Sequence, residues 1–253
     1  MIYSQDYEYH IKLKKGDVGD YVILPGDPGR CEKIASYLTS PCLISENREF
    51  VTYTGYLSGK KVSVCSTGIG GPSAAIALEE LCNIGAHTFI RIGTAGGMDE
   101  KVKSGDAVIA TGAIRQEGTT REYAPIEYPA IADFSVVQAL KEAAIKNNIT
   151  CHMGVVQSKD SFYGQHSPDK MPTAQTLKNN WDAWLKCGAL ASEMETAALF
   201  IVGSIRRVRV GSVLAVMGNQ TRREKNLYDE IIYDTDYAIK IAIDAMKLLI
   251  QSN

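Results

Sequence analysis

The sequence has little net charge, no long apolar run and no targeting signal in its first residues. Its 27 Lys and Arg residues nearly balance its 29 Asp and Glu residues, leaving a formal net charge of −2 at pH 7. No global field therefore attracts nucleic acid. No apolar run approaches the ~18–20 residues of a membrane-spanning helix, and the opening MIYSQDYEYH lacks the basic and apolar regions of a signal peptide. We expect a cytoplasmic protein with neither a nucleic-acid nor a membrane partner.

Cysteine and histidine are few and scattered, which argues against a zinc-type centre. The chain has six cysteines and four histidines, and no pair of them has the short spacing of zinc ligands. Several cysteines lie in apolar runs, which favours small buried thiols in a reducing cytosol.

Strand-like and helix-like segments alternate along the chain, and this alternation predicts the fold class. A chain of 253 residues that is 45% hydrophobic can form one large core, so we expect a single domain spanning residues 1–253. The alternation predicts a three-layer α/β/α sandwich with a central mixed, mostly parallel sheet. Residues 49–66 are typical of a hairpin that turns at 57–60. The expected strands are 21–25, 49–57, 62–66, 88–93, 106–111, 152–157 and 211–217, and the expected helices are 29–38, 72–84, 135–147, 193–203 and 232–251.

Three glycine-rich turns follow successive strands, and they suggest a ligand site. They are GDPGR at 26–30, STGIGGPS at 66–73 and RIGTAGG at 91–97. Ligands bind at the carboxyl ends of strands in α/β sheets. One such turn is explained by turn geometry alone, but three in succession are harder to explain in that way.

The type of ligand follows from motifs that are absent and from the arginines that are present. The sequence has no G-x-x-x-x-G-K-[ST] loop, and Ser73 stands where the dinucleotide motif has its last glycine. A free anion therefore fits better than a bound nucleotide. Arg30, Arg48 and Arg91 are the candidate ligands, with Thr94 as a hydroxyl donor.

Two further segments have a structural and a functional interpretation. Ser192 and Glu195, before an apolar helix, match a capping box; alternatively, the Glu195 carboxylate accepts hydrogen bonds from a sugar diol. The polar stretch 158–180 predicts a long loop, in which an aromatic ring and the Gln165 amide could hold a base or simply belong to that loop.

Together the stretches PGDPGR, NREF, STGIGGPS, RIGTAGG, DSFYGQ and SEMET resemble the nucleoside phosphorylase superfamily. That superfamily includes uridine phosphorylase, bacterial-type purine nucleoside phosphorylase and adenosylhomocysteine nucleosidase, and the resemblance is closest to the uridine phosphorylase branch. It extends from His10 to the last helix. It implies a homohexamer, a trimer of dimers, whose active sites are shared between subunits.

The resemblance also implies residue roles. It assigns the catalytic roles to Arg91, Glu195 and Gln165. It assigns phosphate binding to Gly26, Arg30, Arg48, Arg91 and Thr94; ribose binding to His10, Glu193, Met194 and Glu195; and base binding to Thr94, Gly96, Phe162, Gln165, His166 and Lys170. Arg48 and His10 would come from a neighbouring subunit. Some relatives hold K⁺ at the dimer interface, which points to Glu49, Ile69 and Ser73.

The base-side residues depart from the best-known pattern of that family. An arginine normally two positions after the base-reading glutamine is Ser167 here, and a second is Gln220, although Arg222 and Arg223 follow it. The purine branch has an acid after the strand matching 211–217, whereas this chain reads MGNQT at 217–221. A uracil anion spreads its charge over two carbonyl oxygens, so hydrogen-bond donors can stabilise it without a general acid.

The implied reaction is phosphorolysis of uridine, and also of deoxyuridine, to uracil and the sugar 1-phosphate. Inorganic phosphate is the co-substrate, and no cofactor is required. Three alternatives stay open: a purine nucleoside phosphorylase, a nucleosidase that uses water, and a non-catalytic nucleoside-binding or storage protein of the same fold.

Overall fold

The computed structural model describes residues 7–228 and 230–252. Its strands are β1 (Tyr21–Pro25), β2 (Thr39–Asn47), β3 (Phe50–Leu57), β4 (Lys60–Cys65), β5 (Thr88–Gly97), β6 (Ala107–Gln116), β7 (Ala130–Ile131), β8 (Cys151–Lys159), β9 (Ala191–Glu193) and β10 (Arg209–Asn219). Its α-helices are α1 (Cys31–Ala35), α2 (Gly71–Asn83), α3 (Thr119–Tyr123), α4 (Phe134–Lys146), α5 (Phe162–His166), α6 (Ala174–Lys186), α7 (Thr196–Arg206), α8 (Gln220–Glu224) and α9 (Asp236–Gln251). Short 3₁₀ turns are η1 (Pro28–Arg30) and η2 (Pro168–Lys170).

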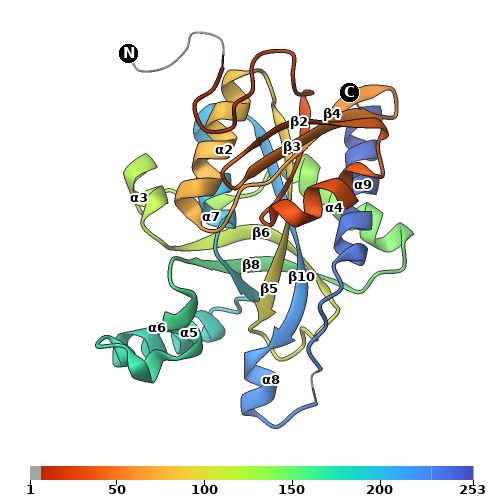
Figure 1. The fold of residues 1–253 in the computed structure, drawn as a ribbon. Helices are drawn as coiled ribbons and strands as arrows, with labels where there is room; N and C mark the ends of the chain where they lie inside the picture. The colour runs from red at the N-terminus through yellow and green to blue at the C-terminus, as the bar shows by residue number, and fades with distance from the viewer. Residues whose placement is uncertain (1–6, 229, 253) are drawn as a thin grey trace.

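The strands form one mixed sheet, in the order β10-β6-β8-β9-β5-β1-β4-β3-β2 (Figure 1). Strands β4, β1, β5 and β10 are parallel neighbours, while β2, β3 and β4 form an antiparallel meander. Because β10 pairs with both β6 and β5, the strands β10, β6, β8, β9 and β5 also close into a ring. The predicted mixed sheet is confirmed, but the sequence did not reveal the ring, because closure depends on pairings between distant strands.

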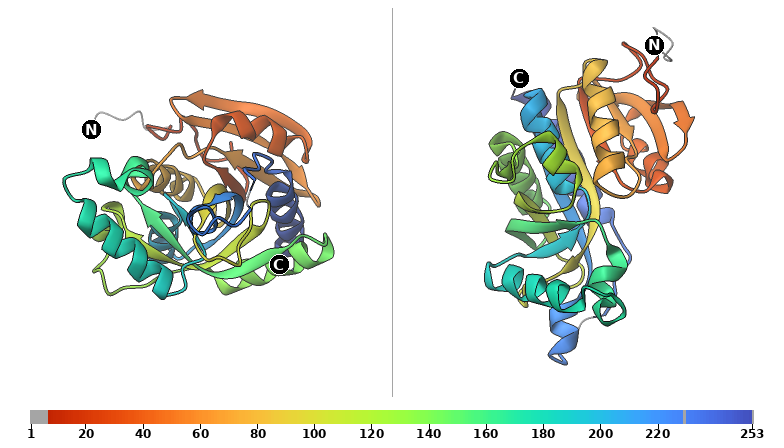
Figure 2. Two further views of the ribbon diagram at one scale, coloured as in Figure 1. Left: turned by 90° about the horizontal axis from the view of Figure 1, so that it is seen from below. Right: turned by 90° about the vertical axis from the view of Figure 1, so that its left-hand side faces the viewer.

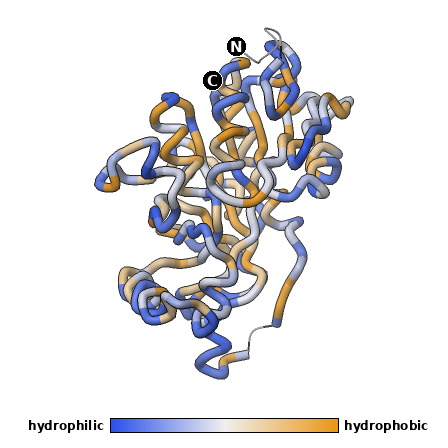
Figure 3. The backbone as a smooth tube through the Cα atoms, turned by 60° about the vertical axis from the view of Figure 1, so that its left-hand side comes forward, coloured by the Kyte–Doolittle hydropathy of each residue, from blue (hydrophilic) through white to orange (hydrophobic). Residues whose placement is uncertain are grey.

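Helices cover both faces of the sheet and create two apolar cores. One core contains residues of α2 and α7, and the other contains residues of α1, α4 and α9. Strand β1 serves both, since Val22 and Leu24 belong to the first core and Tyr21 and Ile23 to the second. This explains the unbroken apolar run of that strand. Figure 2 shows the layers from two further directions, and Figure 3 shows hydrophobic segments concentrated inside the fold.

Most predicted elements are present, with shifted ends. The hairpin is confirmed, since β3 and β4 pair antiparallel and Leu57 lies opposite Lys60. Helix α2 begins next to Pro72 and ends before Gly85, as its sequence signals predicted. The expected helix 29–38 is shorter, consisting of η1 followed by α1.

The expectation of a long irregular loop at 158–180 was wrong. Strand β8 continues to Lys159, and α5, η2 and the first half of α6 occupy most of the remainder. Helix α6 has no buried residue, although its apolar side chains at 177, 181, 184 and 185 recur at the helical spacing. The glycine and prolines that precede it had suggested an irregular stretch.

The cysteine prediction was correct in part. Cys31 and Cys65 are buried, whereas Cys42 and Cys187 are exposed. Burial raises the pKa of Cys31 to about 11 and that of Cys65 to about 12. Both buried thiols are therefore protonated and unreactive at neutral pH.

Candidate active site

The first wall of the site is the turn after β1. Asp27 Oδ1 accepts a hydrogen bond from the Gly29 amide at 2.9 Å and caps the 3₁₀ turn η1. This local cap fixes the direction in which Arg30 leaves the backbone. A methyl group at Gly26 would lie 3.7 Å from Arg30 Nη2 and 3.8 Å from Arg91 Nη1. The missing side chain of Gly26 therefore leaves space beside two guanidinium groups.

The second wall is β5, which carries Arg91 in its interior. Arg91 lies opposite Leu24 of β1 and Ser212 of β10, and only 2% of it is exposed. A methyl at Gly93 would come within 2.7 Å of Arg91 Nη2. Glycine at that position gives the guanidinium room to cross the strand towards the turn after β1.

Two carboxylates, one at the end of β9 and one just after it, hold Arg91 from the other side. Arg91 Nη2 donates a short hydrogen bond to Glu195 Oε2 and lies 3.2 Å from Glu193 Oε2. Glu195 Oε1 also accepts from the Gly70 amide at 2.6 Å. The turn at 66–73, β5 and the segment before α7 therefore meet at one carboxylate. Burial is the largest effect on Glu195 and raises its pKa, while Arg91 lowers it.

The capping-box interpretation of this segment was wrong. Ser192 lies in β9 and Glu195 is itself the N-cap residue, with no side-chain capping bond. Glu193 takes that role, because its Oε2 accepts from the amides of Glu195 and Thr196 at 2.9 Å each. The helix end is thus capped without Glu195, which leaves the Glu195 carboxylate to Arg91 and the Gly70 amide.

The arginine cluster has buried donors that face the space at Gly26. Arg30 Nη1, Arg91 Nε and Arg91 Nη1 are buried and have no hydrogen-bond partner among the described residues. Burial, followed by the charge of Arg91, lowers the pKa of Arg30. Two buried guanidinium groups repel each other, and a small anion between them would satisfy both donors and charge.

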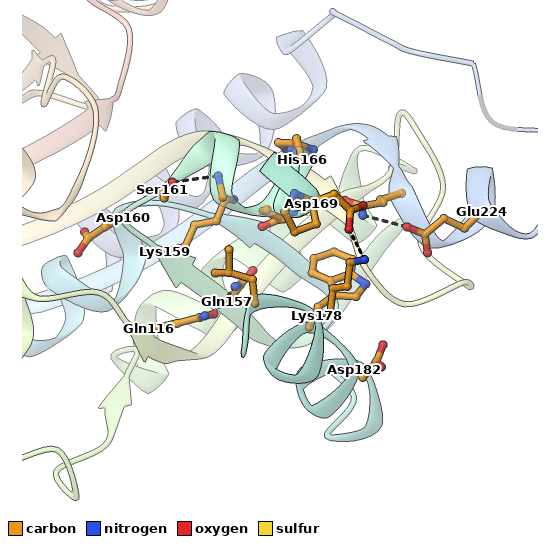
Figure 4. Close-up of a pocket in the computed structure, with 16 residues that line it drawn as sticks. Gln116, Gln157, Lys159, Asp160, Ser161, His166, Asp169, Lys178, Asp182 and Glu224 are labelled. Carbon is orange, nitrogen blue, oxygen red and sulfur yellow. Dashed lines mark hydrogen bonds and ion pairs between the residues drawn. The ribbon is translucent and has the colours of Figure 1, made fainter. Parts of the chain in front are cut away.

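A cavity of about 560 Å³ is lined by residues of β8, α5, α6 and α8 (Figure 4). Gln165, from α5, lies in its wall, and its Oε1 accepts a hydrogen bond from Ser192 Oγ at 2.7 Å. Lys159, the last residue of β8, donates from Nζ to the same Ser192 Oγ at 2.6 Å. The predicted base-reading glutamine is therefore tied by one hydroxyl to the segment that holds Glu195.

His166 and Gln220 also line this cavity. Burial lowers the pKa of His166, and the positive charges of Lys159 and Arg223 lower it further. His166 is therefore neutral at pH 7 and offers one donor and one acceptor. Gln220, in α8, donates to Glu224 at 2.9 Å, while its buried Oε1 has no hydrogen-bond partner in the described part of the chain.

The remaining predicted base and ribose residues are more peripheral. Phe162 is 52% exposed, and its ring centroid lies 4.4 Å from that of His166. Thr94 and Lys170 are exposed, and Gly96 and Met194 are partly exposed. None of these five residues is part of the cavity lining described above, whereas His166 is.

Arg48 and His10 are not joined to the arginine cluster by any hydrogen bond or ion pair among residues 7–228 and 230–252. Arg48 is exposed at the tip between β2 and β3, with φ 56°. The His10 ring nitrogen Nδ1 lies 2.6 Å from Glu80 Oε1, and Glu80 also accepts from the His10 and Ile11 amides. The chain thus presents both residues at its periphery.

The residues expected at a K⁺ site lie partly together. Ser73 Oγ donates to Glu49 Oε1 at 2.8 Å and also to the Thr67 carbonyl. Ile69 is 79% exposed. Carboxylate, hydroxyl and backbone oxygens suit an alkali cation, so the donor set fits such an ion.

Sequence reasoning missed Lys159 and the capping role of Glu193. Lys159 follows an apolar strand and is 7% exposed, but one lysine beside Asp160 resembles an ordinary strand end. Placing it beside Ser192 would have required knowing how β8 and β9 pair.

No described helix is long and apolar enough to cross a bilayer.

Comparisons with known proteins identify the family of this chain. The sequence profile described as "Phosphorylase superfamily" matches residues 20–250. A uridine phosphorylase from Treponema pallidum is 59% identical over 250 residues, covering 99% of this chain and 97% of the relative. A uridine phosphorylase from Escherichia coli is 38% identical, covering 98% and 100%. A guanosine phosphorylase from Halorubrum lacusprofundi is 35% identical, covering 95% and 98%. The chain therefore belongs to the phosphorylase superfamily.

Proposed function

We propose that this protein is a uridine phosphorylase, a pentosyltransferase that converts uridine and phosphate into uracil and ribose 1-phosphate. The observation that carries the proposal is the set of buried, unpartnered guanidinium donors of Arg30 and Arg91 beside Gly26, next to Glu195. A phosphorylase needs a place for phosphate at one face of a sugar, whereas a hydrolase needs none. The uridine phosphorylase relatives named above support the choice of reaction.

In the proposed mechanism, phosphate itself is the nucleophile. Arg30 and Arg91 hold it below C1′, with Arg48 contributed by a neighbouring copy. The C1′–N1 bond breaks, its electron pair moves into the uracil ring, and a phosphate oxygen forms the new bond to C1′. The sugar passes through an oxocarbenium-like state, which the phosphate dianion and Glu195 stabilise. Binding the anion against C1′ also removes an entropic part of the barrier.

Glu195 has a second role in this proposal, as an acceptor for the ribose hydroxyls. Its two oxygens already accept from Arg91 and from the Gly70 amide. A carboxylate oxygen can accept more than one hydrogen bond, so these contacts orient Glu195 without exhausting it. His10 of a neighbouring copy would meet the 5′-hydroxyl.

The proposal includes an oligomer and an alkali cation. Arg48 and His10 are peripheral in the single chain, so a site that uses them is completed by a second copy, as in a hexamer built from dimers. Glu49, Ser73 and the backbone near Ile69 would hold K⁺ between two copies, in a structural role and without a step in the chemistry.

A purine nucleoside is the second candidate substrate, because one relative is named a guanosine phosphorylase. The residues after β10 argue against it. Asn219 is fully buried, and its amide nitrogen donates to the carbonyls of Asp99 and Val102 at 2.8 Å each. An amide in that position cannot protonate a departing purine.

An absorbance assay tests the proposal. Uridine, deoxyuridine, thymidine, inosine and guanosine are each incubated with the enzyme, with and without phosphate. We expect base release from uridine that requires phosphate. Release without phosphate would identify a nucleosidase, preferential release from inosine or guanosine would identify a purine enzyme, and no release from any nucleoside would favour a binding protein.

A further inference from the structure

The base-side cavity contains one lysine whose ammonium is enclosed. Lys159 is 7% exposed at the end of β8, and its hydrogen-bond partner is the hydroxyl of Ser192. Taking an ammonium out of water is costly unless a carboxylate compensates it. Burial accordingly lowers the pKa of Lys159 to about 8, while the more distant charges of Glu193 and Glu195 act in the opposite direction.

The other cationic side chains of the cavity wall are less suitable for holding an anion there. Lys178 is about half exposed and its ammonium lies 2.5 Å from Asp169 Oδ1. His166 is neutral at pH 7, for the reasons given above. Lys159 is thus the enclosed cation among the described residues that line the cavity.

The position of Lys159 relates it to both parts of the substrate site. Ser192 Oγ lies between Lys159 Nζ and Gln165 Oε1, with 2.6 Å to the first and 2.7 Å to the second. Ser192 also precedes Glu193, whose carboxylate contacts Arg91. An ammonium has three donors, so Lys159 can bond Ser192 and still offer two N–H groups to a ligand in the cavity.

We propose that Lys159 stabilises the uracil anion as it leaves, by donating a hydrogen bond from its enclosed ammonium to a carbonyl oxygen of the base. This inference rests on the proposed uridine phosphorylase activity. When the C1′–N1 bond breaks, its electron pair spreads over O2 and O4 of the ring. Because Lys159 is only 7% exposed, its charge is weakly screened by solvent and acts strongly on a bound base. Water supplies the proton that converts the released anion into uracil.

The test compares two substrates that differ in how readily the base leaves. Fluorine withdraws electrons, so the anion of 5-fluorouracil needs less stabilisation than that of uracil. Lys159→Met removes the charge and keeps an unbranched side chain of similar length. Single-turnover experiments isolate the chemical step. In Lys159→Met we expect the rate of this step to fall about a hundredfold with uridine but only about tenfold with 5-fluorouridine.

Lys186→Met is the matched control, because Lys186 is exposed at the end of α6. It should leave the ratio of the two rates unchanged. Lys159→Gln is a second variant should the methionine variant fold poorly, which melting temperatures would show. Ser192→Ala removes the shared hydroxyl but keeps the ammonium, so its losses should be similar for the two substrates.

Equal losses with both substrates in Lys159→Met and Lys159→Gln would overturn the inference and leave a structural role. A Ser192→Ala variant that reproduces the selective loss would also overturn it, because Lys159 would then act by positioning Gln165. Failure of the proposed function looks different: the wild-type protein itself would release no uracil in response to phosphate.

Discussion

At the scale of single residues, the proposed phosphate site depends on the missing side chain of Gly26. Gly26 has no side chain in the space beside Arg30 Nη2 and Arg91 Nη1. A methyl there would make contacts of 3.4 Å or longer with its neighbours, so the fold can accept it while the ligand cannot. Glycine is thus needed at this position for binding more than for folding.

Gly26→Ala should therefore lower activity without lowering stability. We expect the KM for phosphate to rise about tenfold or more, because the methyl occupies space beside the two arginines. Phosphate-dependent initial rates and melting temperatures measure the two effects. Gly118→Ala is the control, since its methyl would lie 3.6 Å from Asp160 Oδ2 on the surface. An unchanged phosphate KM in Gly26→Ala would contradict this placement of the anion.

The pH dependence of Lys159 gives a second prediction at this scale. With a pKa of about 8, its ammonium is charged at pH 7 and loses its proton as the pH rises through 8. Burial lowers this pKa, whereas the charges of Glu193 and Glu195 raise it. Lys159 in turn lowers the pKa of its neighbour His166.

The wild-type rate of the chemical step should accordingly fall above pH 8, and the advantage over Lys159→Met should shrink there. Ionisation of uridine itself affects both proteins equally, so the ratio of the two rates isolates the lysine. A ratio that stays constant from pH 6.5 to 9.5 would show that this titration does not affect the reaction.

At the scale of elements, β5 contributes both to the stability of the sheet and, through Arg91, to the proposed phosphate site. The strand lies in the middle of the sheet, between β1 and β10, and it carries Arg91 between two buried carboxylates. Removing Arg91 leaves the buried Glu193 and Glu195 without their counter-charge. Arg30, on a surface turn, has no such structural partner closer than 4.0 Å among the described acidic groups.

Arg91→Ala should therefore lose both phosphate binding and stability. Leaving a buried ion-pair partner uncompensated costs about 3–5 kcal/mol, which corresponds to a melting temperature lower by roughly 10 °C. Arg30→Ala should raise the phosphate KM about ten- to hundredfold with little change in melting temperature. Calorimetry and phosphate kinetics on the same preparations separate the two effects.

Arg206→Ala is the control for the loss of an arginine, because its ion pair with Glu79 is partly exposed and contributes little. If Arg91→Ala melts like Arg206→Ala, the two carboxylates do not depend on Arg91.

Two of the strands that sequence reasoning missed share a physical cause. Strand β9 has three residues, and β2 is almost entirely exposed, so neither has the periodic apolar pattern on which prediction relies. Helix α6 does carry apolar side chains at helical spacing, but none of its residues is buried. By contrast, β1 and α9 have long apolar runs or stripes. Strand β1 has the predicted bounds, and α9 ends at the predicted residue 251 but begins at Asp236 instead of 232.

At the scale of the whole molecule, Arg48 and His10 have no described contact with the arginine cluster of their own chain. Arg48 is exposed at a hairpin tip, and His10 is bonded to Glu80. If both complete the site of a neighbouring copy, each site combines residues of two chains. Two variants that are each defective in a different chain's contribution can then form intact sites together.

Co-expression of Arg48→Ala with Arg30→Ala should therefore restore activity. Each homogeneous variant has a defect in every site, whereas random mixing gives about one quarter of sites without either defect. Co-expression of Gly26→Ala with Arg30→Ala is the control and should restore nothing, because both residues come from the same chain. Lack of restoration in the first mixture would place Arg48 outside the neighbour's site.

Local features of the sequence were enough to predict the layered fold and to suggest an anionic ligand. Glycine-rich turns after apolar strands and interior arginines are local features, and local features survive in a linear pattern. Only the tertiary structure showed that Glu193, not Ser192, caps α7, and that Lys159 faces Gln165 across one hydroxyl. These relations depend on how β8 and β9 align and on the closure of five strands into a ring. Such pairings join residues far apart in sequence, where no local propensity acts.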